Sequence, residues 1–208
     1  MTGLTLDDIV DLRAYERVRD DYRRRVIARK RRRRVPVGLV ITFVFECADT
    51  VRFQVQEMAR AERILSDEGI QGELDVYNRL LPEPGELSAT MFIELTSEAE
   101  LGHWLPRLVG VERSVAFELP TAAGAAPEVV AGVPEASHAQ ALTRESVTAA
   151  VHYLRFGFTP GQVARFASSP VALSVGHPAY RARTELSEET RAELLGDLRG
   201  ETVAIPLV

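Results

Sequence analysis

The sequence predicts an α/β or α+β fold in which helices flank one mixed β-sheet of about six strands. Segments with a helical spacing of apolar residues alternate along the 208 residues with short runs rich in β-branched and aromatic side chains. Hydrophobic residues make up 46% of the chain and charged residues 26%, which is typical of a globular protein and excludes a disordered chain.

A long basic helix is predicted near the N-terminus, from about residue 14 to residue 30. Its apolar residues recur at spacings of three and four and form one helical stripe: Tyr15, Val18, Tyr22 and Val26. The other faces of this helix carry arginines. The basic run of residues 29–34 has no apolar stripe, so we expect it to lie on the surface.

The chain then alternates between strand and helix up to residue 119. Strands are predicted over residues 37–46, 87–95 and 114–119, where Val, Ile, Leu, Met and Phe are frequent. Helices are predicted over residues 51–66, 73–81 and 97–108. Gly69 is expected to end the first of these helices. Ser97 and Glu100 form a capping box at the start of the third.

Residues 120–139 contain mostly Ala, Gly, Pro and Val, with almost no large side chains. Such a stretch buries too little surface to offset the entropy of ordering it, so we predict a flexible loop. The loop separates residues 35–119 from residues 140–208. We expect these two parts to form one domain, and residues 1–34 to form a separate basic helical element.

The C-terminal part repeats the alternation. Strands are predicted over residues 146–156, 171–175 and 202–207, and helices over residues 160–167 and 188–198. Thr159, Pro160 and Gln162 give the first helix a cap, a proline at its first position and a capping glutamine. Ser187 caps the second helix and Gly200 ends it.

Charge is divided unevenly along the chain. Residues 1–34 carry 12 basic and 6 acidic side chains, a net charge of +6, whereas residues 35–208 carry 13 basic and 24 acidic ones, a net charge of −11. A cationic segment on an acidic body indicates an anionic partner or docking onto the protein's own surface. The candidate partner-binding residues are Arg29, Lys30, Arg31, Arg32, Arg33 and Arg34.

A segment that is solvated or docked onto the protein's own acidic surface is favoured over an external partner, and an acidic protein is favoured over nucleic acid. Guanidinium groups bind phosphates, and a run of them gives salt-dependent affinity for nucleic acid. RNA-binding proteins usually add exposed aromatic residues for base stacking, but Tyr15 and Tyr22 belong to the packing stripe.

The sequence contains no motif specific enough to indicate a catalytic site, a cofactor site or a metal site. The chain has no phosphate-binding loop, dinucleotide fingerprint or Gly-x-Ser-x-Gly turn. Glu100 and His103 form one Glu-x-x-His pair, whereas a di-iron site requires two such pairs and two further glutamates. Cys47 has no His or second Cys close in sequence, so we interpret it as a buried thiol. We predict no metal and no cofactor.

A cytoplasmic location is predicted. The longest apolar run, residues 35–45, is about half the length needed to cross a bilayer. Asp7, Asp8 and Asp11 stand where a secretory signal would carry cationic and apolar residues. The single cysteine fits a reducing compartment.

A polar motif follows the predicted strand at residues 171–175 and consists of His177, Tyr180 and Arg183. Loops at strand ends often carry binding residues, and these side chains have the chemistry of an acid–base group, a hydrogen-bond donor and an anion clamp. The alternative is a turn in which Gly176 and Pro178 interrupt the strand and Tyr180 packs.

Short stretches spread over most of the chain outside residues 120–139 carry a further pattern. They are Arg31–Gly38, Phe43–Glu46, Asp49–Thr50, Gln54–Met58, Glu62, Glu73–Leu74, Tyr77–Asn78, Leu81–Pro82, Glu86–Glu94 and His177–Tyr180. Together they resemble a bacterial family of proteins of unknown function, which has no established activity. The genes of that family often lie beside those of rubrerythrin-like and iron–sulfur oxidoreductase proteins, which implies a role near redox or iron metabolism.

Within this resemblance, four polar residues are candidates for lining a cleft: Glu46, Gln54, Glu57 and Asn78. Glu46 ends a predicted strand, and Gln54 and Glu57 lie one helical turn apart. The alternative is that these residues cap and bridge helices.

Three functions remain open. The first, which we favour, is a non-catalytic accessory protein that docks onto a redox or iron-handling partner through its basic segment. The second is an enzyme or a small-molecule- or metal-binding protein with a cleft near Glu46, Glu57 and His177. The third is a nucleic-acid binder.

Overall fold

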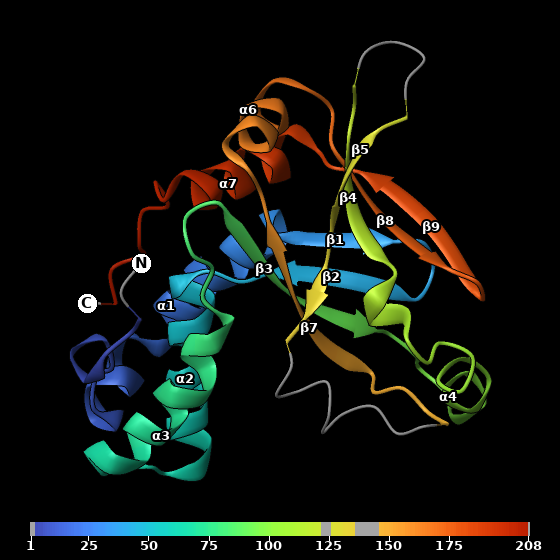
Figure 1. The fold of residues 1–208 in the computed structure, drawn as a ribbon. Helices are drawn as coiled ribbons and strands as arrows, with labels where there is room; N and C mark the ends of the chain where they lie inside the picture. Colours follow the sequence, from blue (N-terminus) through green and yellow to red (C-terminus); the bar gives the residue numbers. More distant parts are fainter. Residues whose placement is uncertain (1–2, 122–125, 136–145, 208) are drawn as a thin grey trace.

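The computed structural model describes residues 3–121, 126–135 and 146–207 (Figure 1). The strands are β1 (Arg34–Val37), β2 (Ile41–Phe45), β3 (Glu86–Ile93), β4 (Val115–Leu119), β5 (Glu128–Ala131), β6 (Val133–Pro134), β7 (Val151–Gly157), β8 (Ala172–His177) and β9 (Tyr180–Glu185). The α-helices are α1 (Leu12–Arg32), α2 (Ala48–Glu62), α3 (Asp67–Tyr77), α4 (Glu98–Trp104), α6 (Pro160–Ser168) and α7 (Glu188–Arg199). Single 3-10 turns are η1 (Leu6–Asp8), η2 (Asn78–Leu80) and η3 (Val111–Arg113).

The described strands form two antiparallel sheets, with the orders β1-β2-β3-β7-β6 and β5-β4-β8-β9. The α+β class predicted from the sequence is confirmed, but the single mixed sheet is wrong. β1 and β2, like β8 and β9, are joined by turns too short for the crossover that parallel strands require, so they pair in antiparallel fashion.

One hydrophobic core lies between the two sheets and takes residues from both sides of the stretch 120–139. Phe117 on β4 meets the rings of four other phenylalanines, with ring centroids 4.9 to 5.9 Å apart: Phe45, Phe156, Phe158 and Phe166. These tilted and edge-on arrangements are the favourable geometries for aromatic pairs.

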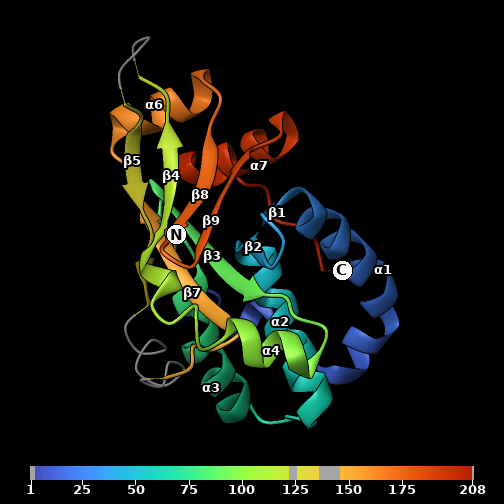
Figure 2. The same ribbon diagram turned by 90° about the vertical axis from the view of Figure 1, so that its right-hand side faces the viewer.

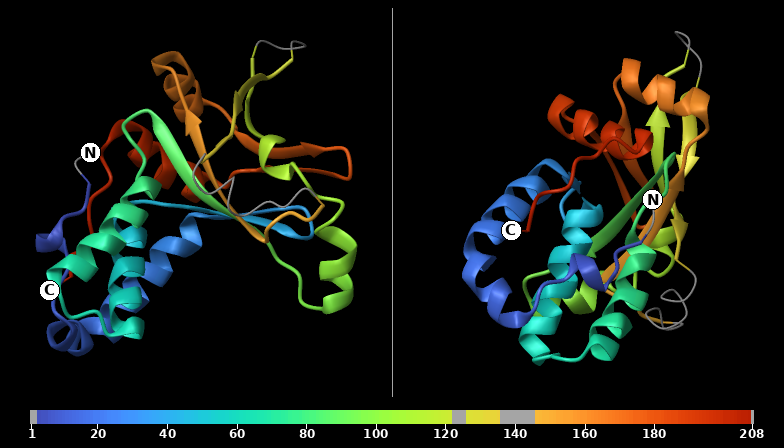
Figure 3. Two further views of the ribbon diagram at one scale, coloured as in Figure 1. Left: turned by 60° about the horizontal axis from the view of Figure 1, so that its bottom comes forward. Right: turned by 90° about the vertical axis from the view of Figure 1, so that its left-hand side faces the viewer.

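The five-stranded sheet turns a second row of side chains away from this core. Val44, Thr90 and Tyr153 are direct partners across β2, β3 and β7, and alternation along each strand sets them opposite the core residues. Helices α1, α2 and α3 gather on this outer side, whereas α6 and α7 lie at the upper end of the molecule, where α7 meets the C-terminal end of α1 (Figures 2 and 3). The outer face of the sheet therefore lies against a helical layer.

Residues 34–45 form a hairpin of β1 and β2, whereas a single strand was predicted over residues 37–46. Gly38 has a φ of +75° at the turn between β1 and β2, and a Cβ at this position would clash with the hydroxyl of Tyr180. Leu39, at the tip of the turn, is 94% exposed. The apolar run that suggested one buried strand belongs to two paired strands, with Val35 opposite Phe43.

Several other expected elements differ from the structure. Strands β5 and β6 form within residues 120–139, where a loop was predicted; residues 122–125 and 136–139 lie outside the described residues. Strand β9 was not predicted, and Gly69 lies inside α3 instead of ending a helix. Residues 202–207 run along α1 and α2 instead of forming a strand, and Leu207 packs in the cluster of Tyr15 and Tyr22.

Helices α4, α6 and α7 begin at the predicted caps: Ser97, Thr159 and Ser187. Within the part of the chain that the structure describes, none of the helices combines the length and the apolar character needed to span a bilayer.

Candidate functional site

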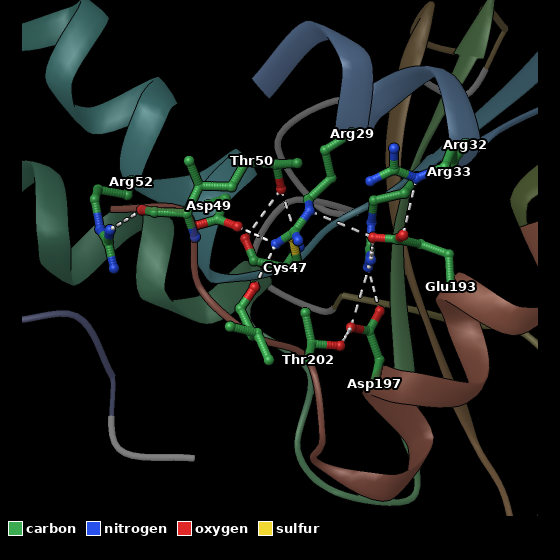
Figure 4. A network of polar contacts seen from close by, with 12 residues as sticks. Arg29, Arg32, Arg33, Cys47, Asp49, Thr50, Arg52, Glu193, Asp197 and Thr202 are labelled. Carbon is green, nitrogen blue, oxygen red and sulfur yellow. Dashed lines mark hydrogen bonds and ion pairs between the residues drawn. The ribbon is translucent and has the colours of Figure 1, made fainter. Parts of the chain in front are cut away.

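Arg33 lies at the centre of a buried ionic network (Figure 4). Its side chain is 0% exposed, and it donates hydrogen bonds to the carbonyl oxygens of Phe45 at 2.8 Å and Glu46 at 3.0 Å and to the carboxylate of Asp197. Asp197 and Glu193 stand one turn apart on α7, so both carboxylates reach the C-terminal end of α1. The partial negative charge of that helix end also favours cations there.

Three more arginines of the basic run pair with the protein's own carboxylates: Arg29 with Asp49, Arg32 with Glu193, and Arg34 with Glu94. The prediction that this run lies on the surface is wrong for Arg29 and Arg33, whose side chains are 14% and 0% exposed. Acidic residues from α2 and α7, distant in sequence, neutralise them. Much of the positive charge expected for an external partner is therefore used internally.

Lys30 and Arg31 are the exceptions within the run. Neither forms an ion pair with any described residue. The ammonium nitrogen of Lys30 lies 5.8 Å from the ring centroid of Phe53, and Arg31 is exposed. These two cations remain available to a ligand.

A cavity of about 530 Å³ opens beside these cations, between α1, α2 and the outer face of the five-stranded sheet. Its size falls in the range of small-molecule pockets, roughly 300–1,000 Å³. The lining residues are Ile27, Lys30, Arg31, Arg34, Val44, Glu46, Gln54, Thr90, Phe92, Val151 and Tyr153. The cavity therefore combines cations from α1 with an apolar and polar lining from the sheet.

Glu46 is the buried carboxylate of this cavity, with 4% of its surface exposed. The hydroxyl of Thr50 donates to one carboxylate oxygen at 2.5 Å, and the hydroxyl of Thr90 donates to the other at 2.6 Å. Burial raises the pKa of Tyr153 above its usual value, and Tyr77 and the charge of Glu46 add to this effect. Glu46 and Tyr153 are thus close enough for the charge of one to affect the other.

The cavity brings together only two of the predicted cleft residues, Glu46 and Gln54. Gln54 has no hydrogen-bond partner among the described residues, so its amide is available. Ile27, Phe92 and Val151 supply apolar surface. An amphipathic anion fits this arrangement, since its charged end can meet Lys30 and Arg31 while its apolar body meets the sheet.

Glu57 and Asn78 serve other parts of the structure. Glu57 accepts hydrogen bonds from the Tyr15 hydroxyl at 2.7 Å and from Arg19, which joins α2 to α1. The amide of Asn78 holds the backbone of Leu4 through two bonds of 2.8 Å. Glu57 and Asn78 therefore bridge structural elements, as the alternative to a cleft proposed.

His177, Tyr180 and Arg183 do not reach the cavity. The His177 ring contacts the carbonyl oxygen of Val109 at 3.2 Å, and the Tyr180 hydroxyl donates to the carbonyl oxygen of Val37 at 2.7 Å. Arg183 on β9 pairs with Glu118 on β4, within the four-stranded sheet. The cleft predicted from Glu46, Glu57 and His177 is therefore wrong: these residues belong to three separate environments.

The remaining candidates have structural roles. Glu100 accepts hydrogen bonds from the backbone and hydroxyls of Thr96 and Ser97 and so completes the helix cap. Cys47 is 1% exposed, and burial raises the pKa of its thiol. Among the residues that the structure describes, no group of three or more His, Cys, Asp or Glu side chains is arranged to hold a metal ion.

Replacing Glu57 with glutamine is expected to lessen the loss of stability in acid. Hydrogen bonds from Arg19, 2.8 Å to each carboxylate oxygen, hold the pKa of Glu57 below its usual value. Such a carboxylate contributes stability above its unfolded-state pKa of about 4.3, and the contribution is lost as pH falls through the folded-state pKa. Urea midpoints from pH 7 to pH 3 should fall less for E57Q than for the wild type; equal declines would contradict this role.

A family model described as "Protein of unknown function (DUF3501)" matches residues 3–198. A crystal structure of a novel protein of unknown function from Burkholderia pseudomallei K96243 is similar, with 35% sequence identity and a TM-score of 0.83. The match covers 95% of this chain and 100% of that protein. No curated protein matches the chain. The predicted resemblance to a bacterial family of unknown function is confirmed, and neither description includes an activity.

Proposed function

The chain belongs to the DUF3501 family of proteins of unknown function, and we propose that it binds a small amphipathic organic anion in the cavity beside α1. The observation that supports this proposal is the pair of cations without carboxylate partners, Lys30 and Arg31, at a cavity lined partly by apolar side chains. Arg29, Arg32, Arg33 and Arg34 are neutralised internally, so within the run of residues 29–34 only Lys30 and Arg31 have no carboxylate partner among the described residues.

The dye 8-anilinonaphthalene-1-sulfonate (ANS) is a suitable probe because it joins one sulfonate to an apolar aromatic body. We expect saturable binding of ANS to the wild-type protein. The double variant K30E/R31E should bind ANS at least about tenfold more weakly, because charge-assisted contacts are lost and repulsion replaces them. Fluorescence titration at constant ionic strength measures the effect, and circular dichroism checks that the variant is folded.

The matched control is R13E/R17E, which makes the same change in charge on the same helix. Arg13 and Arg17 line a separate open hollow with the exposed Leu65. ANS affinity should be unchanged in this control. Equal losses in both variants would mean general attraction to α1, and a loss in the control alone would place the dye at the Leu65 hollow; either result would contradict the proposal.

A protein partner is a second proposal, favoured by the outer face of α1. Arg13, Arg17 and Arg23 are exposed there and form no ion pair with described residues. A redox or iron-handling protein with an acidic surface would contact these residues and Arg31 rather than the whole run of residues 29–34. Nucleic acid is the weaker alternative, because the tyrosines of α1, Tyr15 and Tyr22, are buried. A cytoplasmic location remains part of either proposal.

A further inference from the structure

We infer that the ligand of this cavity is a zwitterion, whose cationic group binds the buried carboxylate of Glu46 while its anionic group binds Lys30 and Arg31. The inference rests on the proposed function and specifies the class of ligand. It assigns Glu46 as the residue that would distinguish a zwitterion from a simple anion.

The first support is that Glu46 is a buried carboxylate without a counter-ion. It is 4% exposed, and no Lys, Arg or His side chain of the described chain lies within ion-pair distance of it. Two other buried carboxylates, Asp49 and Asp197, are each 1% exposed and each pair with an arginine. An unpaired buried charge is costly, so a cationic group that entered the cavity would stabilise the Glu46 carboxylate.

The second support is the geometry around that carboxylate. Each of its oxygens accepts one hydroxyl hydrogen bond, from Thr50 or Thr90, and a carboxylate oxygen has a second acceptor position. The nearby guanidinium of Arg33 donates to the backbone carbonyl of Glu46 and to Asp197, so it does not neutralise the side chain. Capacity therefore remains for an ammonium group from the cavity.

The third support is that both signs of charge line the same space. Lys30 and Arg31 belong to α1, whereas Glu46 lies at the junction of β2 and α2. Phe92 and Val151 line the same cavity with apolar surface. A ligand with a carboxylate, an ammonium group and an apolar body would satisfy all three kinds of lining, which a simple anion would not.

The test compares three compounds with the same indole ring: L-tryptophan, indole-3-propionate, which lacks only the ammonium group, and tryptamine, which lacks the carboxylate. Isothermal titration calorimetry should show that tryptophan binds the wild-type protein at least about tenfold more tightly than either of the others, since each lacks one charge-assisted contact. The variant E46Q should lose the preference for tryptophan over indole-3-propionate, and circular dichroism checks that it is folded.

The outcomes separate this inference from the proposed function. Equal binding of tryptophan and indole-3-propionate by the wild type, or no binding of tryptophan, would overturn the zwitterion inference. If ANS binding still depended on Lys30 and Arg31 in that case, the anion-binding proposal would stand. Failure of ANS to bind would contradict the proposed function itself. The wild-type comparison does not depend on whether E46Q folds.

Discussion

Replacing Arg33 with methionine is expected to destabilise the protein by about 3–5 kcal/mol. Methionine keeps much of the side-chain volume but removes the guanidinium. The carboxylate of Asp197, which is 1% exposed, would then lie buried, and the Thr202 hydroxyl at 2.6 Å would be its only remaining hydrogen-bond donor among the described residues. The carbonyl oxygens of Phe45 and Glu46 would also lose a donor. Urea denaturation measures the change in the free energy of unfolding.

The matched control for this prediction is Arg32→Met. Arg32 pairs with Glu193 through a side chain that is 35% exposed, so its loss should cost less than about 1 kcal/mol. A second variant, R33M/D197N, also removes the negative charge of Asp197, which has no cationic partner in R33M. It should therefore regain part of the stability lost in R33M. Equal destabilisation in R33M and R32M would contradict the central role of Arg33.

Local signals in the sequence predicted most helix starts and several strands, because these features depend on neighbouring residues. The capping pairs Ser97–Glu100 and Thr159–Gln162 form as expected. The turn at Gly38 was missed because its requirement comes from Tyr180, which is 142 positions away and packs against it. Strand β9 was missed although it alternates, with Tyr180 buried and Arg181 exposed, because the residues around Pro178 were expected to form only a loop or a turn.

The basic run shows where reasoning from local charge fails. The sequence predicted exposed positive charge at residues 29–34, and a solvated or self-docked segment was favoured over an external partner. The structure supports self-docking for Arg29, Arg32 and Arg33, because α7 brings Glu193 and Asp197 against the end of α1. No local pattern identifies this pairing, which joins residues more than 150 positions apart.

The cavity was predicted only in part for the same reason. Glu46 and Gln54 were identified from the strand-to-helix segment that contains both. Thr90 and Tyr153 join them only through the register of β2, β3 and β7, which places Val44, Thr90 and Tyr153 in one row. Polar residues in otherwise apolar strands, such as Thr90 and Tyr153, were the available signal for this site.

Replacing Val151 with tryptophan is expected to weaken ANS binding about 10- to 100-fold. Val151 lies on the cavity wall and is half-buried, so an indole ring at this position would occupy the space that the apolar body of the dye requires. The expected loss corresponds to roughly 1.5–3 kcal/mol of apolar burial. The charges of Lys30, Arg31 and Glu46 are unchanged, so this variant tests the cavity separately from the electrostatic attraction.

The proposal that this cavity is a ligand site is tested most directly by a calorimetric titration of ANS into the wild type, V151A and V151W. V151A is the matched control, because it alters the same position and leaves the cavity open. We predict one binding site per chain in the wild type and V151A and a 10- to 100-fold weaker affinity in V151W, with all three proteins folded by their urea midpoints. Equal ANS affinity in V151W and the wild type would contradict the account.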